Sequence, residues 1–320
     1  MNQIESIVLR EKLIEEIYKI MKKDKNIFFL TDDFGAKALD KLRRDFSERF
    51  INIGIAEQNL INIAIGLAYE GFTVFCYGIS TFITMRCYEQ LRNLSLFAEL
   101  KEFNINIIGV GTGYSYELSG PTHHCVEDIS IMKTLPNFMI FSPSNEFILK
   151  YIVDFSIECK KPKYIRLEGK PLKKFTYIYK KKNNFSDGLS ILKEGKDFYI
   201  IGTGNMTHRA IEVAEELEKY KINAGVIDLY RIKPINSELL IEIVKNVRGI
   251  ITIEEHLLAG GMGSAILEVL ADNQINLPVK RFGVRDKYLY AYGGRENIQK
   301  ICGLDKGSIV KDTLDWVKKI

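Results

Sequence analysis

Short apolar runs alternate with segments of helical periodicity along most of the 320-residue chain, and this alternation constrains the fold more than any other feature. The run at residues 27–30 ends at the polar sequence TDD, and it has the length of a buried strand, as do the segments at 73–76 and 106–110. Residues 56–70 and 80–100 carry apolar side chains at helical spacing. Strands that alternate with helices form βαβ units, so the sequence predicts an α/β protein with parallel sheets.

The alternation occurs twice along the chain. It breaks at residues 173–188, which are basic and polar and end in the turn-like sequence SDG. It resumes with a predicted strand at 197–201. We therefore predict two three-layer parallel-sheet domains, at residues 1–172 and 189–320, joined by a linker over 173–188.

The composition excludes several classes of protein. The net charge is only +4, whereas nucleic-acid-binding domains usually concentrate basic residues on one face. The five cysteines are scattered and form no C-x-x-C pair, which argues against a disulfide framework or a zinc site. No apolar run approaches the roughly 18 residues that a membrane span needs, and the first residues lack the apolar core of a signal peptide. We expect a cytoplasmic protein with no nucleic-acid or membrane partner.

Glu57 is the most informative residue of the first predicted domain. It lies among apolar residues at the start of the helix predicted over 56–70, which is apolar nearly all round and is therefore expected to be buried. Desolvation favours the protonated form of a carboxyl group, and such a group suits proton transfer near neutral pH. A simpler interpretation stays open here: a glutamate in a first helical turn also complements the helix dipole.

Several short motifs, taken together in order and spacing, resemble the transketolase family. They are GIAEQ at 54–58, GISTF at 78–82, GPTHH at 120–124, SPS at 142–144, EEHLLAGGMG at 254–263 and VRDK at 284–287. The resemblance covers essentially the whole chain and matches the pyrimidine-binding domain of the family followed by its carboxy-terminal domain. It implies an enzyme dependent on thiamine diphosphate that transfers a two-carbon ketol unit between sugars.

The resemblance also implies which residues bind the cofactor. Glu57 would activate it through a hydrogen bond to a ring nitrogen of the aminopyrimidine, and the cofactor would then supply the carbanion chemistry. Aromatic and sulfur-containing side chains would pack on the ring. The other cofactor-binding residues implied are Phe82, Met85, Tyr88, Asp33 and Ile55. The alternative for the stripe at 82, 85 and 88 is an ordinary hydrophobic core.

Substrate-binding residues follow from the same resemblance. His123 would be a catalytic acid or base near the substrate hydroxyls, because histidine titrates near neutral pH. Arg10 and Arg166 match two arginines that clamp a substrate phosphate, a role that suits guanidinium groups. A solvated helix face is the alternative for Arg10. The full set of substrate-binding residues implied is Arg10, Lys37, Arg166, Ser119 and His123.

Three positions depart from the family pattern. Gly111 stands where the family has a second phosphate-binding histidine, and Lys37 stands near the position of a phosphate-contacting serine. Ser119 replaces an acidic residue that contacts a substrate hydroxyl. Lys37 could still attract an anion, whereas the loss of the acid at Ser119 predicts a donor or acceptor sugar different from the usual ones.

The chain lacks the Gly-Asp-Gly motif with which the family holds Mg²⁺ and the cofactor diphosphate. The resemblance therefore implies a separate amino-terminal, diphosphate-binding subunit that completes the thiamine diphosphate and Mg²⁺ site, in a heterotetramer, with no metal site in this chain. Helices at 56–70 and 80–100 would provide much of the interface. The alternatives are a 1-deoxy-xylulose-5-phosphate synthase-like activity, a 2-oxoacid dehydrogenase beta-type subunit, or a catalytically silent subunit.

Overall fold

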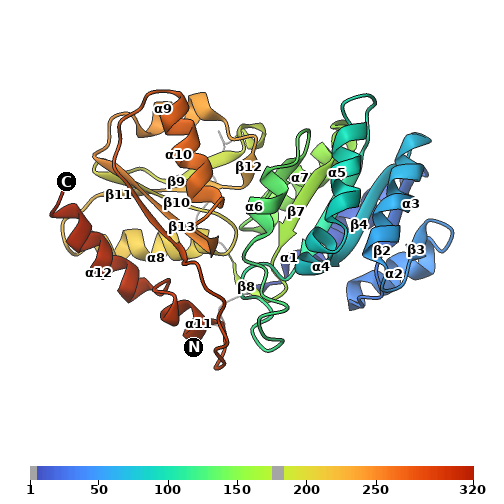
Figure 1. Cartoon of the computed structure of the whole chain (residues 1–320), viewed down its shortest axis with the longest axis horizontal. Helices are drawn as coiled ribbons and strands as arrows, with labels where there is room; N and C mark the ends of the chain where they lie inside the picture. The colour runs from blue at the N-terminus through green and yellow to red at the C-terminus, as the bar shows by residue number, and fades with distance from the viewer. Residues whose placement is uncertain (1–5, 175–183) are drawn as a thin grey trace. The chain divides into compact units, whose positions relative to one another are not determined.

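The computed structural model describes residues 6–174 and 184–320, which form two compact units (Figure 1). The first unit contains the chain up to Thr112 together with Ile131–Lys174. The second contains Gly113–Ser130 and the residues that follow the gap. Most of the linker predicted over 173–188 lies outside the described residues.

The first unit is built on a parallel sheet with the strand order β6-β7-β5-β4-β2-β3. Its strands β5 and β7 are buried along their whole length, as expected for parallel strands covered on both faces. The strands are β2 (Ile27–Thr31), β3 (Phe50–Asn52), β4 (Thr73–Ile79), β5 (Ile105–Val110), β6 (Met139–Phe141) and β7 (Lys163–Leu167). Two short strands, β1 (Ser6–Ile7) and β8 (Leu172–Lys173), pair with each other in antiparallel fashion.

Helices connect these strands and flank the sheet (Figure 1). They are α1 (Leu9–Met21), α2 (Lys37–Asp45), α3 (Glu57–Tyr69), α4 (Ser80–Met85), α5 (Tyr88–Phe97), α6 (Asp128–Lys133) and α7 (Glu146–Glu158). Helix α3 packs on β4 and against α5, while α1 packs against α7. No helix within residues 6–174 and 184–320 is long and apolar enough to cross a lipid bilayer.

The single helix predicted over residues 80–100 is wrong, because the structure divides it into α4 and α5. Cys87 has a non-helical backbone, with φ −110° and ψ 25°. The Thr84 hydroxyl and the Cys87 thiol each donate to the carbonyl four residues earlier, at Ser80 and Ile83. Such bonds compete with the regular helix ladder and bend helices.

Helix α3 also differs from its predicted all-round burial. Its apolar residues Leu60, Ile61, Ala64 and Ala68 are buried within this chain. The opposite side of the helix is exposed, at Gln58, Asn59, Asn62, Gly66 and Tyr69. Hydrophobicity alone therefore overestimates how much of α3 this chain covers by itself.

The second unit contains a sheet with the order β14-β13-β10-β11-β9, in which β9 is the antiparallel edge strand. The strands are β9 (Leu189–Lys193), β10 (Phe198–Gly202), β11 (Ala224–Leu229), β13 (Gly249–Leu257) and β14 (Val279–Val284), with η1 (Phe185–Asp187) before β9 and β12 (Arg231–Lys233) after β11. The helices are α8 (Met206–Glu218), α9 (Ser237–Val244), α10 (Met262–Asp272), α11 (Arg295–Ile301) and α12 (Lys306–Val317). One hydrophobic cluster lies under α8, α11 and α12, and a second lies under α9 and α10. Both units are thus α/β, as predicted.

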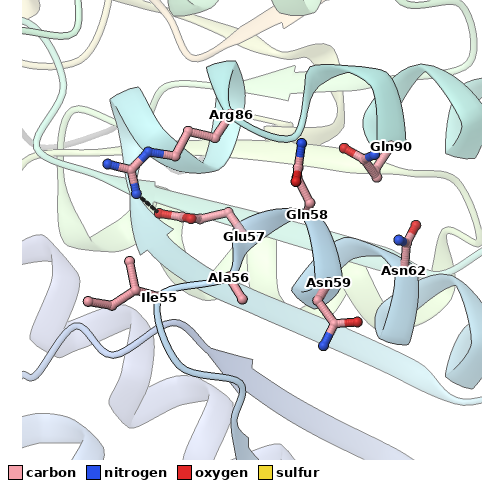
Figure 2. A pocket seen from close by; sticks show the side chains of 8 residues that line it. All are labelled: Ile55, Ala56, Glu57, Gln58, Asn59, Asn62, Arg86 and Gln90. Atoms are coloured by element: carbon pink, nitrogen blue, oxygen red, sulfur yellow. Dashed lines mark hydrogen bonds and ion pairs between the residues drawn. The ribbon is translucent and has the colours of Figure 1, made fainter.

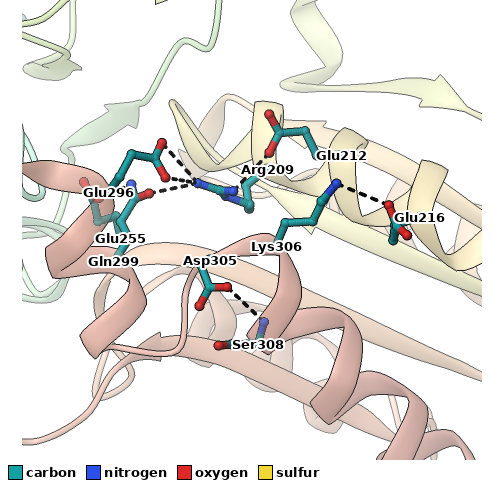
Figure 3. Close-up of polar contacts among 9 residues, drawn as sticks. All are labelled: Arg209, Glu212, Glu216, Glu255, Glu296, Gln299, Asp305, Lys306 and Ser308. Atoms are coloured by element: carbon teal, nitrogen blue, oxygen red, sulfur yellow. Dashed lines mark hydrogen bonds and ion pairs between the residues drawn. The ribbon is translucent and has the colours of Figure 1, made fainter.

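Polar contacts join the helices on one face of the second unit (Figure 3). Arg209 of α8 donates to Glu296 and Gln299 of α11, at 3.1 and 3.0 Å. Lys306 of α12 pairs with Glu216 of α8 at 3.2 Å. These contacts are partly exposed, so each adds little stability by itself.

Glu255, at the end of β13, forms a more deeply buried network. It accepts hydrogen bonds from the Nε of Arg295 at 3.1 Å, from the Nε2 of Gln299 at 2.6 Å and from the backbone N–H of Tyr114 at 2.9 Å. Burial disfavours the charged form of Glu255, but the Arg295 guanidinium and these donors outweigh it and lower the pKa of this carboxyl below its usual range. The network therefore fixes α11 and the segment beginning at Gly113 to the end of β13.

The Glu255 network predicts a large effect of Arg295→Ala. Removing the guanidinium leaves a buried carboxylate without its cation, which costs about 3–5 kcal/mol of unfolding free energy. Arg285→Ala is the matched control, because Arg285 is exposed and such surface changes fall within about 0.5 kcal/mol. Urea denaturation of the two variants measures both values. Equal, small losses in the two variants would contradict the role assigned to the network.

Candidate active site

The carboxyl ends of three adjacent strands of the first unit, β3, β2 and β4, bring polar groups together. Asp32 directly follows β2, Glu57 begins α3 after the loop that leaves β3, and α4 begins directly after β4. The carboxyl edge of a parallel sheet is the usual place for a ligand in such folds. The edge of this sheet is therefore the candidate active site.

Glu57 is buried, with 5% of its side chain exposed, and it is held by Arg86. The Nη1 of Arg86 donates to the Oε1 of Glu57 at 2.8 Å (Figure 2). Arg86 is half exposed, and its guanidinium carbon lies over the ring of Phe82 at 3.9 Å from the centroid. The second oxygen of Glu57, Oε2, accepts no hydrogen bond from any residue that the structure describes.

Asp32 is a further buried carboxyl group beside Glu57, and the sequence alone did not single it out. Burial, and then the negative charge of Glu57, raise the pKa of Asp32 to about 7, although two backbone N–H groups and Arg86 oppose the rise. Its Oδ1 has no hydrogen-bond partner among residues 6–174 and 184–320. Gly78 makes room for it, since a Cβ at that position would lie 2.6 Å from Oδ2. Only burial distinguishes Asp32 from the exposed Asp33 that follows it.

A hollow of about 640 Å³ opens beside Glu57 (Figure 2). Its lining residues are Ile55, Ala56, Glu57, Gln58, Asn59, Asn62, Arg86 and Gln90. The walls combine one buried carboxylate with several amides, and amides can both donate and accept hydrogen bonds. A polar ligand bound in this hollow would therefore meet Glu57 and several amide groups able to form hydrogen bonds.

The other cofactor-binding residues proposed from the sequence lie in different surroundings. Phe82, in α4, lies beneath Arg86, and Met85 is partly exposed at the end of the same helix. The hydroxyl of Tyr88 donates to the carbonyl of Ile131 at 3.0 Å, which fixes this ring on the other side of the helix break. Asp33 is exposed and accepts a hydrogen bond from Asn52 at 3.0 Å. Ile55 is 77% exposed at the rim of the hollow.

The proposed substrate-binding residues divide between the two units. Arg10 in α1, Lys37 at the start of α2 and Arg166 in β7 belong to the first unit. Arg166 is buried and Lys37 is exposed, whereas the Nε of Arg10 is buried and has no hydrogen-bond partner within the described ranges. Ser119 and His123 belong to the segment Gly113–Ser130 of the second unit.

The segment that carries His123 is anchored through its neighbours. The Nδ1 of His123 lies 3.1 Å from the hydroxyl of Thr122, and its backbone N–H donates to the carbonyl of Gly120 at 3.0 Å. His124 is buried edge-on against Tyr114, with ring centroids 5.0 Å apart. Burial lowers the pKa of His124, so this residue suits a neutral supporting position. Ser119 is exposed, while Gly111 is buried with a φ of 91°.

No group of three or more His, Cys, Asp or Glu side chains in the described part of the chain could hold a metal ion. The residues of the first unit nevertheless fit one half of a cofactor site. They provide a buried carboxylate with a free oxygen, an aromatic ring one helical turn before Arg86, and an open polar hollow.

Fold and site together define an α/β chain with a buried glutamate at the edge of its first sheet, and comparison with known proteins identifies the family. Residues 5–173 match the family model described as "Transketolase, pyrimidine binding domain". Residues 188–309 match "Transketolase, C-terminal domain". The chain therefore belongs to the transketolase family, which confirms the resemblance inferred from its motifs.

Individual relatives agree with this assignment. The chain is 33% identical over 313 residues to the "Putative transketolase C-terminal section" of Methanocaldococcus jannaschii, covering 97% of this chain and 96% of that protein. It is 31% identical to a protein of Actinobacillus succinogenes that is named as a subunit of an apulose-4-phosphate transketolase, covering 83% and 84%. A solved structure described as "Split gene transketolase, inactive beta4 tetramer" superposes with a TM-score of 0.83 at 31% identity, covering 95% and 96%.

The raised pKa of Asp32 predicts a pH-dependent stability. Between about pH 4 and pH 7 the folded chain keeps a proton that Asp32 of the unfolded chain has lost, so stability falls as pH rises through this window. The loss is about 4 kcal/mol at most, from a pKa of about 7 against an ordinary 3.8. We expect Asp32→Asn to gain stability relative to the native chain between pH 5 and pH 8.

Denaturant unfolding at these two pH values measures the difference. Asp33→Asn is the control, because Asp33 is the exposed neighbour of the same type. If the native chain and Asp32→Asn showed the same change between pH 5 and pH 8, Asp32 would not hold the proton.

Proposed function

We propose that this chain is one subunit of a transketolase that transfers a two-carbon ketol unit between sugars with thiamine diphosphate as cofactor. The observation that carries the proposal is the burial of Glu57 together with its hydrogen bonding. Its carboxylate is buried and held at Oε1 by Arg86, its Oε2 accepts no hydrogen bond from the described residues, and the residue lines an open hollow. In a member of the transketolase family this geometry suits the group that activates the cofactor.

The chain's own residues would act on the cofactor ring in simple ways. When bound, thiamine diphosphate supplies the carbanion chemistry of ketol transfer. Glu57 would hold the proton that a ring nitrogen shares with Oε2, and Phe82 would contribute an aromatic surface beside it. Asp32, whose pKa is raised to about 7, would be only partly ionised near pH 7 and would add less than one full negative charge to the site.

A separate amino-terminal subunit would supply the binding site for the cofactor diphosphate and Mg²⁺. Relatives that the chain matches over most of their length are named as a transketolase section or subunit, which supports a divided enzyme. We propose a heterotetramer, with two copies of each chain. The exposed side of α3 supports an interface here, because it leads into an apolar groove of about 360 Å³. The groove is lined by Ile65, Gly66, Tyr69, Glu70, Phe97, Leu100, Lys101 and Phe103.

The substrate would be an anionic sugar bound by basic groups. Arg166 is buried in β7 and would hold a phosphate or similar anion, with Arg10 and Lys37 as the other cationic groups. His123 would exchange protons with the substrate hydroxyls. The replacements at Gly111 and Ser119 support a donor or acceptor other than the common sugar phosphates.

We expect Glu57→Gln to lower ketol transfer by roughly 100-fold or more, since groups that transfer protons contribute about 10²–10⁴-fold. Glutamine keeps the shape of the side chain but cannot share a proton in the same way. The assay uses this chain purified together with the amino-terminal subunit. Glu48→Gln is the control, because Glu48 is exposed and should leave the rate unchanged.

Two results would contradict the proposal. Unchanged transfer in Glu57→Gln would mean that the chain is a catalytically silent subunit. Consumption of pyruvate with release of carbon dioxide would instead indicate a 1-deoxy-xylulose-5-phosphate synthase-like activity.

A further inference from the structure

We propose that Arg86 is a positioning residue for Glu57: it fixes one oxygen of the carboxylate and thereby reserves the other oxygen for the cofactor ring. This inference rests on the proposed function, because it assigns a role to a residue beside the activating glutamate. Arg86 would not touch the reacting atoms, and its effect would pass entirely through Glu57.

The guanidinium of Arg86 is held on two sides. Its Nη1 lies 2.8 Å from the Oε1 of Glu57, and its central carbon lies 3.9 Å from the centre of the Phe82 ring. The backbone N–H of Arg86 donates to the carbonyl of Phe82 at 3.0 Å, so the two side chains project from successive turns of α4. An ion pair combined with a cation–π contact restricts a long side chain that is otherwise half exposed.

The contact also joins two elements that are independent in sequence. Glu57 begins α3, whereas Arg86 follows the last residue of α4, where the helix breaks before α5. From the end of α4 the side chain of Arg86 reaches the carboxylate of Glu57 at the start of α3 (Figure 2).

The charges around Glu57 explain why a cation is needed. The titratable groups whose electrostatic interaction with Glu57 is seen are Asp32, the Cys87 thiol and Arg86. Two carboxyl groups and a thiol close together disfavour the ionised forms of one another by repulsion, and burial disfavours these charged forms as well. Arg86 compensates the negative charge of the Glu57 carboxylate, while burial and that same charge raise the pKa of Asp32 to about 7.

The two carboxylate oxygens of Glu57 have different surroundings, and this difference decides which of them is available to a ligand. Oε1 is bound to Arg86, and Oε2 accepts no hydrogen bond from the described residues. A ring nitrogen that approaches through the hollow would therefore meet Oε2. Without Arg86 the buried carboxyl group would lose the cation that compensates its charge and would be free to rotate, so Oε2 would no longer be held in one orientation for the ring.

The experiment compares Arg86→Met and Arg86→Lys with the native chain, each purified together with the amino-terminal subunit. Methionine keeps an unbranched side chain but removes the charge, while lysine keeps the charge and loses the planar stack on Phe82. We expect Arg86→Met to weaken thiamine diphosphate binding about 10-fold or more, the scale of one charge-assisted hydrogen bond. The acidic limb of the kcat profile should shift to higher pH by about one unit, and Arg86→Lys should restore most of that shift.

A second measurement needs neither cofactor nor partner. Infrared difference spectra between each isolated chain and its Glu57→Gln counterpart show whether Glu57 is ionised. We expect a carboxylate band at neutral pH in the native chain and in Arg86→Lys, and a protonated carboxyl band in Arg86→Met. Arg285→Met is the control and should change neither spectrum nor binding, since Arg285 is exposed in the second unit.

The outcomes separate this inference from the proposed function. Tighter cofactor binding in Arg86→Met would overturn it, because Arg86 would then compete with the ring rather than prepare for it. Unchanged binding, pH profile and infrared bands in Arg86→Met would also overturn it. If Glu57→Gln itself left transfer unaffected in the same assay, the proposed function would fail, whatever the result at Arg86.

Discussion

One constraint shapes the first unit: a carboxylate has been taken out of water at the carboxyl edge of a parallel sheet and must be compensated there. Glu57 is compensated by Arg86 from a neighbouring helix, and the nearby Asp32 responds to burial and to the charge of Glu57 with a pKa raised to about 7. Gly78 leaves room for Asp32, and Arg86 reaches Glu57 from the end of α4. Gly78 and Arg86 thus both accommodate the same pair of buried carboxyl groups.

Much of the fold could be predicted from the sequence because its central strands are continuous apolar runs. Strands β2, β4, β5 and β11 lie where such runs occur, and these strands are buried on both faces. Elements with a weaker apolar signal were not identified. Helix α2 is rich in charged residues and buries only Leu39 and Leu42, while β3 is three residues long. Strand β9 is an antiparallel edge with a half-buried pattern, which is ambiguous in a single sequence.

The site was only partly predictable, for a different reason. Glu57 could be found because its motif places it at the start of an apolar helix. Asp32 and Asp33 are identical in sequence terms, and only the three-dimensional structure shows that the first is buried and the second exposed. Arg86 resembles any charged residue on a helix until its contact with the distant Glu57 is known. Contacts between distant segments of the chain decide the roles of these residues, and the local sequence pattern carries no information about such contacts.

The exposed side of α3 is a candidate surface for binding a partner subunit. Helix α3 is covered on one side only, and the end of its exposed side lines an apolar groove, which leaves surface that a partner chain could bury. The same helix begins with Glu57, so a partner bound along α3 would lie beside the hollow that the glutamate faces. Binding of the partner and completion of the cofactor site would then be one event.

A mixing experiment tests whether this chain provides one half of a thiamine diphosphate site. Thiamine diphosphate binding and ketol transfer are measured for this chain alone, for the amino-terminal subunit alone, and for their equimolar mixture. We expect tight binding and transfer only in the mixture. Full thiamine-dependent transfer by this chain alone would contradict the division of the site between two chains.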